Sequence, residues 1–166
     1  QAIREPLQEQ GILALAHGID GSARQLLQTF KTNPKTVLLG TSSFWEGVDV
    51  VGEALSVLVI VRLPFAVPTD PVIAARSELF DDPFNQYQVP ETVLRFRQGF
   101  GRLIRSRHDR GVVAVLDRRL QTKAYGAAFL KSLPDCTMER GPVRDLPALA
   151  ARWIDGQVPV QKTLGI

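Results

Sequence analysis

The stretch Val57-Leu-Val-Ile-Val61 decides the fold, because it places five aliphatic residues in a row. A strand with no polar residue on either face is typical of a parallel sheet that is covered on both sides. Further short apolar runs lie at 11–17, 36–39 and 112–116, and helix-like segments separate them. Because strands and helices alternate, the sequence predicts an α/β fold, an open and mainly parallel sheet with helices on both faces.

The composition is that of a globular domain. The chain has 166 residues, of which 45% are hydrophobic and 22% charged. Its single cysteine, Cys136, excludes an internal disulfide framework and a cysteine-held metal cluster within the chain. No apolar run approaches the roughly 18 residues of a membrane span, and no signal-peptide pattern opens the sequence. We therefore expect a cytoplasmic protein with no membrane partner.

A proline-rich segment interrupts the alternation at about 64–90. Its five prolines are Pro64, Pro68, Pro71, Pro83 and Pro90. Within it only Val72 to Phe80 has a helical pattern, so the segment is predicted to be an excursion from the sheet. A long helix is expected from about Glu91 to Ser106, an edge strand at 136–139 and a last amphipathic helix at 146–154.

The positive charge is concentrated in one window. The net charge is +3, but residues 95–119 hold eight arginines against two aspartates, which gives 8 − 2 = +6 and leaves −3 for the rest. Such a block indicates an anionic partner, for example phosphates or a nucleic-acid backbone. A solvated basic face is the alternative.

The helix expected at 91–106 separates apolar from polar residues. At about 100° per residue, one face collects the apolar side chains: Val93, Phe96, Phe100, Leu103 and Ile104. Gln98, Arg102 and Arg105 share the opposite face, and Gly99 and Gly101 would let a ligand approach the backbone closely. An amide and two guanidinium groups suit a polyphosphate, because forked donors match phosphate oxygens. Pairing of the arginines with carboxylates of a neighbouring element is the alternative.

A second candidate site begins where the strand at 36–39 ends. The loop reads Gly40-Thr-Ser-Ser-Phe-Trp-Glu-Gly-Val-Asp49. Ligands of open α/β sheets bind at the carboxyl ends of strands, where exposed N–H groups can hold phosphates and a carboxylate can bind a ribose hydroxyl. Alternatively, Ser42 or Ser43 caps a helix, with Glu46 as the capping-box partner.

Together these two segments resemble a known family. Gly40-Thr-Ser-Ser-Phe-Trp-Glu-Gly-Val-Asp-Val-Val-Gly52 resembles motif V of superfamily 2 helicases, and Gln98-Gly-Phe-Gly-Arg-Leu-Ile-Arg105 resembles motif VI. The flanks Arg62–Phe65, Asp70–Arg76 and Leu116–Arg119 are similar to the bacterial DinG branch of the DinG/XPD family. The resemblance implies a RecA-like three-layer αβα fold, the second (C-terminal) helicase domain, in a fragment (1–166) that lacks the first strand.

The resemblance also implies a role for individual residues. The catalytic positions that reach the γ-phosphate are Gln98, Arg102 and Arg105, the two arginines acting as arginine fingers. The positions near ATP are Glu46, Gly47, Asp49 and Gly101. The positions on the single-stranded DNA path are Thr41, Ser42, Ser43, Arg62, Phe65 and Arg76.

Parts of a complete motor are missing from the sequence. It contains no G-x-x-x-x-G-K-[ST] and no D-E-A-H-type box, so the Mg²⁺ ligands are expected in the first helicase domain of the same protein. No metal site is expected in this chain, and an iron–sulfur cluster, if any, would lie outside it. The implied activity is that of a 5′-to-3′ ATP-dependent DNA helicase. The alternative is a non-catalytic, truncated paralogue that binds nucleic acid or a partner protein.

Overall fold

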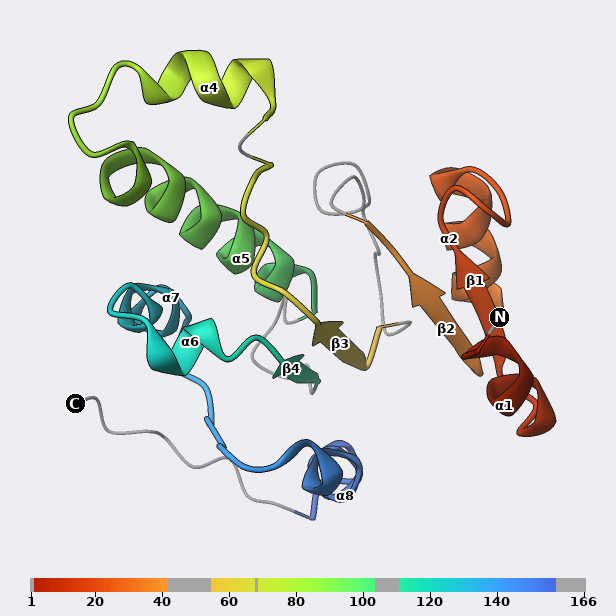
Figure 1. Ribbon diagram of the computed structural model, residues 1–166. Coiled ribbons are helices and arrows are strands. Elements are labelled where there is room, and N and C mark those ends of the chain that lie inside the picture. The colour runs from red at the N-terminus through yellow and green to blue at the C-terminus, as the bar shows by residue number, and fades with distance from the viewer. Residues whose placement is uncertain (1, 42–54, 68, 104–110, 158–166) are drawn as a thin grey trace. The chain divides into compact units, whose positions relative to one another are not determined.

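The computed structural model describes residues 2–41, 55–67, 69–103 and 111–157, with the side chain of Arg102 left out (Figure 1). The chain divides into two compact units, unit 1 at Gln1–Leu55 and unit 2 at Ser56–Ile166. Each unit contains a pair of parallel strands with helices around it, so the fold is α/β as predicted.

Unit 1 is built on a parallel pair of strands. Its elements are α1 (Arg4–Glu9), β1 (Leu13–Ala16), α2 (Ala23–Thr32) and β2 (Thr36–Leu39). In the register of the pair, Leu13 lies opposite Thr36 and Ala16 opposite Leu39. Helix α2 begins with a capping box, in which Gln25 N–H donates to the Ser22 hydroxyl and Ser22 N–H donates to the Gln25 side chain.

Unit 2 holds the second parallel pair and most of the helices. Its elements are β3 (Val57–Ile60), α4 (Pro71–Ser77), the π-helical turn η1 (Phe84–Gln88), α5 (Val89–Leu103), β4 (Val112–Val115), α6 (Arg119–Thr122), α7 (Gly126–Lys131), the 3₁₀ turn η2 (Val143–Asp145) and α8 (Leu146–Ile154). Val57 lies opposite Val112 and Ile60 opposite Val115. Helix α5 contacts α7 and β4, and α8 contacts β4.

The core of unit 2 lies between α5 and α7. Phe96 of α5 and Phe129 of α7 are both 0% exposed, and their rings meet edge to face with centroids 5.4 Å apart. Ile60 of β3 and Ala114 of β4 are buried as well. The strands and α5 are therefore held in one packed body, which fixes the motif VI helix relative to the carboxyl ends of β3 and β4.

The buried face of α5 differs from the predicted one. Phe96, Phe100 and Leu103 are buried as expected, but Thr92 and Gly99 are buried too, whereas Val93 is only half-buried. Thr92 can be buried because its hydroxyl donates to the Gln88 carbonyl at 2.6 Å. The face is thus rotated toward Thr92. The prediction placed Val93 at its centre because apolar character alone does not reveal a satisfied hydroxyl.

Strand β3 is not covered on both faces by unit 2 itself. Ile60 is 3% exposed, whereas Val57 and Val59 are 38% and 48% exposed. The described elements of unit 2 therefore bury one face of this strand only, and the prediction of two covered faces is wrong for unit 2 by itself. The physical reason is that an all-apolar run shows what a strand can bury but not which elements reach it.

Two further boundaries differ from the sequence predictions. Helical structure begins at Phe84, inside the expected excursion, and Pro90 lies in the first turn of α5. Proline is tolerated there, and the wide turn η1 precedes it because Pro90 has no N–H to donate to the carbonyl four residues earlier. Residues 136–139 form no strand. The end of the predicted helix, 104–106, lies outside the described residues.

Candidate nucleotide- and DNA-binding sites

The carboxyl ends of β3 and β4 form one candidate site. Because the strands are parallel and Ile60 pairs with Val115, the residues that follow each strand emerge at the same edge. This is the edge where α/β sheets bind their ligands. Arg62 follows β3 and is exposed, and Asp117 follows β4 with its side chain only 7% exposed.

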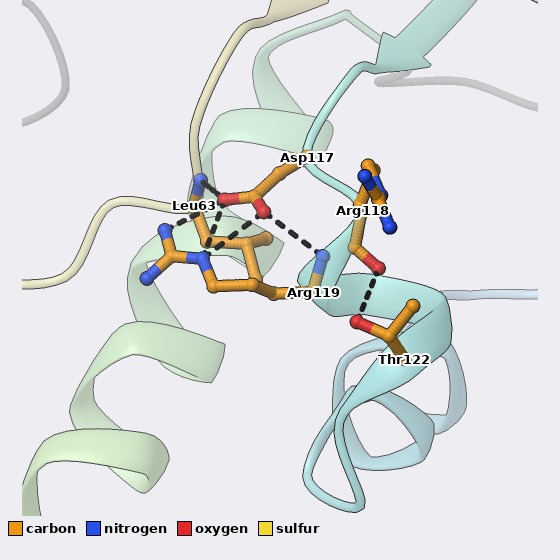
Figure 2. A network of polar contacts seen from close by, with 5 residues as sticks. All are labelled: Leu63, Asp117, Arg118, Arg119 and Thr122. Carbon is orange, nitrogen blue, oxygen red and sulfur yellow. Dashed lines mark hydrogen bonds and ion pairs between the residues drawn. The ribbon is translucent and has the colours of Figure 1, made fainter.

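The Asp117 carboxylate joins these two segments (Figure 2). It accepts the Leu63 N–H at 2.8 Å and the Arg119 N–H at 3.0 Å. The Arg119 guanidinium donates to it through Nε, 3.0 Å from each oxygen, and through Nη2 at 2.6 Å. The carbonyl of the neighbouring Arg118 accepts the Thr122 hydroxyl at 3.1 Å, a contact within α6 (Figure 2). Asp117 therefore holds a forked, charge-assisted contact and a backbone contact at the same time.

The electrostatics keep Asp117 ionised. The hydrogen bonds from the Arg119 side chain, helped by the Leu63 and Arg119 N–H groups, outweigh burial and lower the pKa of Asp117 to about 2. The pKa of Arg119 is raised, chiefly by its hydrogen bonds to Asp117. Both charges are consequently present at any physiological pH.

An aromatic cluster lies beside this ion pair. The Arg119 guanidinium carbon lies 5.1 Å from the centre of the Phe65 ring, a cation–π contact. Phe65 stacks on Phe84 with centroids 5.8 Å apart and meets Tyr125 edge to face at 5.6 Å. Phe129 completes the cluster at 6.2 Å. Phe65 is half-buried, and a nucleobase stacked on its ring would compete with Arg119 or Phe84.

Arg76 belongs to a second set of contacts. It lies near the end of α4, a helix that Asp70 caps by accepting the Val72 N–H at 2.9 Å. The side chain of Arg76 is exposed, and its pKa is raised chiefly by a hydrogen bond to the Tyr87 hydroxyl. The Tyr87 ring stacks on Phe80 with centroids 5.4 Å apart. The predicted DNA residues Arg62 and Arg76 thus both present charge to solvent, but from differently supported segments.

Helix α5 presents part of the predicted ATP site. Gln98 and Gly101 are exposed, on the side of the helix away from the buried Phe96. A Cβ added to Gly101 would meet no atom within 4 Å, so the backbone is open to an approaching ligand. The Gln98 amide and the backbone at Gly101 are thus both accessible on this face of the helix. Arg102 lies in the last turn of α5, and Arg105 lies outside the described residues.

The motif V loop is described only at its start. Thr41 follows β2 and is exposed. The remaining predicted residues of this loop lie outside the described part of the chain: Ser42, Ser43, Glu46, Gly47 and Asp49.

The described residues hold neither a metal-type cluster nor a membrane-type helix. Across 2–41, 55–67, 69–103 and 111–157, no three His, Cys, Asp or Glu side chains gather as metal ligands would. No helix in these ranges is both long and apolar enough to cross a bilayer.

Sequence reasoning missed the residues that organise the β3–β4 edge. Asp117 and Arg119 were noted only as part of a resembling flank, and the ring partners Phe84 and Tyr125 were not singled out. The signal that could have identified Asp117 is its position, because a carboxylate that directly follows a buried parallel strand lies at the ligand edge of the sheet.

Parallel strand pairs packed by helices, with polar segments at their carboxyl ends, place both units in the α/β class. The chain belongs to the Helicase C-terminal domain family, whose profile matches residues 1–136. The match includes both the motif V loop and the motif VI helix. This confirms the family that the two motifs indicate.

Several bacterial proteins are similar to this chain. It is 44% identical over 156 residues to the 3′-5′ exonuclease DinG of Bacillus subtilis, covering 91% of the chain and 17% of that protein. It is 47% identical over 133 residues to the ATP-dependent DNA helicase YoaA of Escherichia coli, covering 78% and 21%. The ATP-dependent DNA helicase DinG of Photobacterium profundum is 44% identical over 108 residues, covering 63% and 16%. The chain thus spans about a fifth of the length of these relatives.

Proposed function

We propose that this chain is the second motor domain of a DinG-like ATP-dependent DNA helicase. The observation that carries the proposal is the family match over 1–136, which includes both motifs, together with relatives named as ATP-dependent DNA helicases at 44–47% identity. The family match crosses the boundary between the two units at residue 55. This supports treating the two units as parts of one RecA-like domain, which we propose to span residues 1–166.

In this proposal Arg102 and Arg105 act as arginine fingers and Gln98 assists them at the γ-phosphate. Planar guanidinium groups match phosphate oxygens and offset the charge that develops during phosphoryl transfer. Glu46, Gly47, Asp49 and Gly101 would line the nucleotide, and the open backbone at Gly101 supports such an approach. Mg²⁺, held by the first helicase domain, would neutralise the phosphates, and an iron–sulfur cluster, if present, would lie in that other part of the protein.

ATP that binds between two domains draws them together when the arginines favour the triphosphate over the diphosphate. Single-stranded DNA would lie along Thr41, Ser42, Ser43, Arg62 and Arg76, with Phe65 near the bases.

The helicase would move along the single strand from its 5′ end toward its 3′ end. Since the substrate is DNA, we place the protein in the bacterial cytoplasm.

The test uses the full-length protein. Arg105→Ala should lower kcat for DNA-stimulated ATP hydrolysis about 10³-fold, and Arg102→Ala should resemble it, because each removes charge stabilisation from the transition state. Arg105→Lys should not restore the rate, since lysine lacks the planar fork. The matched control is Arg97→Ala, which removes an exposed arginine from the same helix.

Normal turnover in both the Arg102 and Arg105 variants would contradict the arginine-finger proposal. The chain by itself should show no ATP hydrolysis above background, because it contains no Walker lysine. Turnover by the pure chain would contradict the proposed division of labour between two domains.

A second candidate function follows from the exonuclease name of the Bacillus subtilis relative, which matches 91% of this chain. In that case the domain would serve a nuclease rather than a strand-separating motor. The full-length protein would then shorten a 3′-labelled strand and leave a duplex with protected ends intact, whereas a helicase would separate that duplex in the presence of ATP.

A further inference from the structure

The turn that follows β3 is held at both ends. The Leu63 N–H donates to Asp117, and the Leu63 side chain is 3% exposed. The Phe65 N–H donates to the Leu63 carbonyl at 2.8 Å, which closes a three-residue turn around Pro64. Arg119 lies on the Phe65 ring. The same carboxylate–guanidinium pair therefore contacts both the entry and the exit of this turn.

The contact at Leu63 has a direct effect on Arg62. The Leu63 N–H belongs to the peptide plane between Arg62 and Leu63, so its hydrogen bond fixes the orientation of that plane. This orientation sets ψ of Arg62. Because Arg119 binds both carboxylate oxygens of Asp117, through Nε to Oδ1 and through Nη2 to Oδ2, the carboxylate cannot turn to follow a shifted N–H. Arg62 itself is exposed and lies at the ligand edge of the sheet.

Stability alone does not explain an ion pair at this position of the fold. A buried ion pair must first give up the hydration of both charges, so apolar side chains of similar size at such positions are often at least as stabilising. The pair does hold the turn in a single conformation, because five hydrogen bonds converge on the Asp117 carboxylate. Geometry matters where a side chain must meet a ligand.

We propose that Asp117 and Arg119 are positioning residues that orient Arg62 toward a phosphate of single-stranded DNA. This inference rests on the proposed function, and it adds two residues that act through Arg62 rather than by touching DNA themselves.

The experiment is a double-mutant cycle in the full-length protein. Asp117→Asn keeps an oxygen that can accept the Leu63 N–H, but it loses the ion pair with Arg119 that holds this oxygen in place, so the Arg62–Leu63 peptide plane is no longer fixed. The substitution should weaken binding of a labelled single-stranded oligonucleotide about fivefold. The slope of log affinity against log salt should fall by about 0.7, as in Arg62→Ala, because one phosphate contact is lost. In an Arg62→Ala background, Asp117→Asn should have no further effect on affinity.

ATPase kinetics separate positioning from general damage. In Asp117→Asn the DNA concentration for half-maximal stimulation should rise about fivefold, while kcat at saturating DNA stays within about twofold. Arg119→Lys keeps the charge but not the fork, so it should weaken DNA binding as well. The matched controls are Asp145→Asn and Arg144→Lys, which alter an exposed ion pair of the same unit with an N–O distance of 3.7 Å.

Three results would overturn the proposal. Unchanged DNA affinity in Asp117→Asn is the first. The second is a double variant whose fold-loss of DNA affinity equals the product of the losses in Asp117→Asn and Arg62→Ala, because the two residues would then act independently. Full affinity in Arg119→Lys with loss in Arg119→Ala is the third, because Arg119 would then contact phosphate directly. If thermal unfolding shows that Asp117→Asn does not fold, the same cycle is run with Arg119→Lys. A wild-type protein that neither binds DNA nor responds to it would instead remove the proposed function itself.

Discussion

Each unit contains an aspartate–arginine pair beyond the carboxyl end of a parallel strand, and the two pairs differ in what they connect. In unit 1, Asp20 accepts the Ala16 N–H at 2.7 Å, four residues away, and pairs with Arg4 of α1. The side chains of Arg4 and Asp20 are 38% and 22% exposed. This pair closes a local turn at the surface.

In unit 2, Asp117 accepts the Leu63 N–H from 54 residues away, and its side chain is 7% exposed. It therefore joins the segments after two different strands.

The two units also differ in the number of buried apolar residues. Leu26 is the only buried apolar residue of unit 1 within the described residues, whereas the other buried apolar residues all lie in unit 2. The comparison suggests that unit 2 carries most of the packing energy, while unit 1 depends more on local contacts.

The largest expected effect is on the cores. Phe96→Ala should lower the free energy of unfolding by about 3–5 kcal/mol, since Phe96 is fully buried against Phe129. Leu26→Ala should cost about 2 kcal/mol, the low end for such a change, because its surroundings are thinner and can collapse. Urea denaturation with hydrogen exchange of each unit measures both. Equal losses would remove the contrast between the units.

The next effect tests the close packing of α6 on α7. A Cβ at Gly126 would collide with the backbone carbonyl oxygen of Leu120, which cannot move without shifting α6. Gly126→Ala should therefore destabilise unit 2 by about 1–3 kcal/mol. Gly141→Ala is the control, because a Cβ there meets nothing within 4 Å. Equal melting temperatures of the Gly126→Ala and Gly141→Ala variants would contradict this packing.

A pH titration compares the two carboxylates. The pKa of Asp117 is about 2 in the folded chain against an ordinary value of 3.8, so its stabilisation is complete above about pH 4 and is lost as the pH falls toward 2. Because Arg119 is 39% exposed, we expect a loss of about 1–2 kcal/mol. The pKa of Asp20 is also lowered, chiefly by the Ala16 N–H, but both side chains of its pair are more exposed to screening solvent than Asp117.

Stability measured from pH 6 to pH 2 should therefore depend less on pH in Asp117→Asn than in the wild type. Asp20→Asn should change the profile much less. A profile that flattens equally in both variants would show that burial does not separate the two pairs.

The smallest expected effect is on the cap of α2 in unit 1. Ser22→Ala removes the acceptor of the Gln25 N–H and should cost about 1 kcal/mol. Thr32→Ala is the control in the same helix, because its hydroxyl donates to the Gln28 carbonyl and caps no N–H. Circular dichroism during urea unfolding measures the difference. A neutral Ser22→Ala would mean that unit 1 relies on tertiary packing rather than on its caps.

Much of the fold could be predicted because its signals are local. The apolar run at 36–39 is a strand, the run at 112–116 contains the strand Val112–Val115, Ser22 caps a helix and 146–154 is helical. The errors came where context decides. The buried face of α5 shifts toward Thr92 because its hydroxyl finds a partner one turn earlier, and β3 has exposed valines because unit 2 covers only one of its faces.

For the candidate sites, too, the local patterns could be predicted from the sequence, whereas the contacts between distant segments could not. Motif V and motif VI are contiguous patterns, so the sequence alone indicated the helicase family, and the profile match confirmed it. Gln98 is exposed on α5 as its helical position predicted. The roles of Arg102, Arg105 and the DNA-path residues stay predictions.

The sequence by itself therefore determined the α/β class, the order of the strands and main helices apart from the strand wrongly expected at 136–139, and the two motifs, because hydrophobic periodicity, caps and motif spacing act over a few residues. Only the tertiary structure decided that the Asp117 carboxylate meets the Leu63 N–H and that Arg119 covers Phe65. These partners are brought together by the parallel register of β3 and β4, and no local window of the sequence contains both strands. The physical reason is that register depends on how α4, α5 and the turns between the strands pack, which is a property of the whole unit.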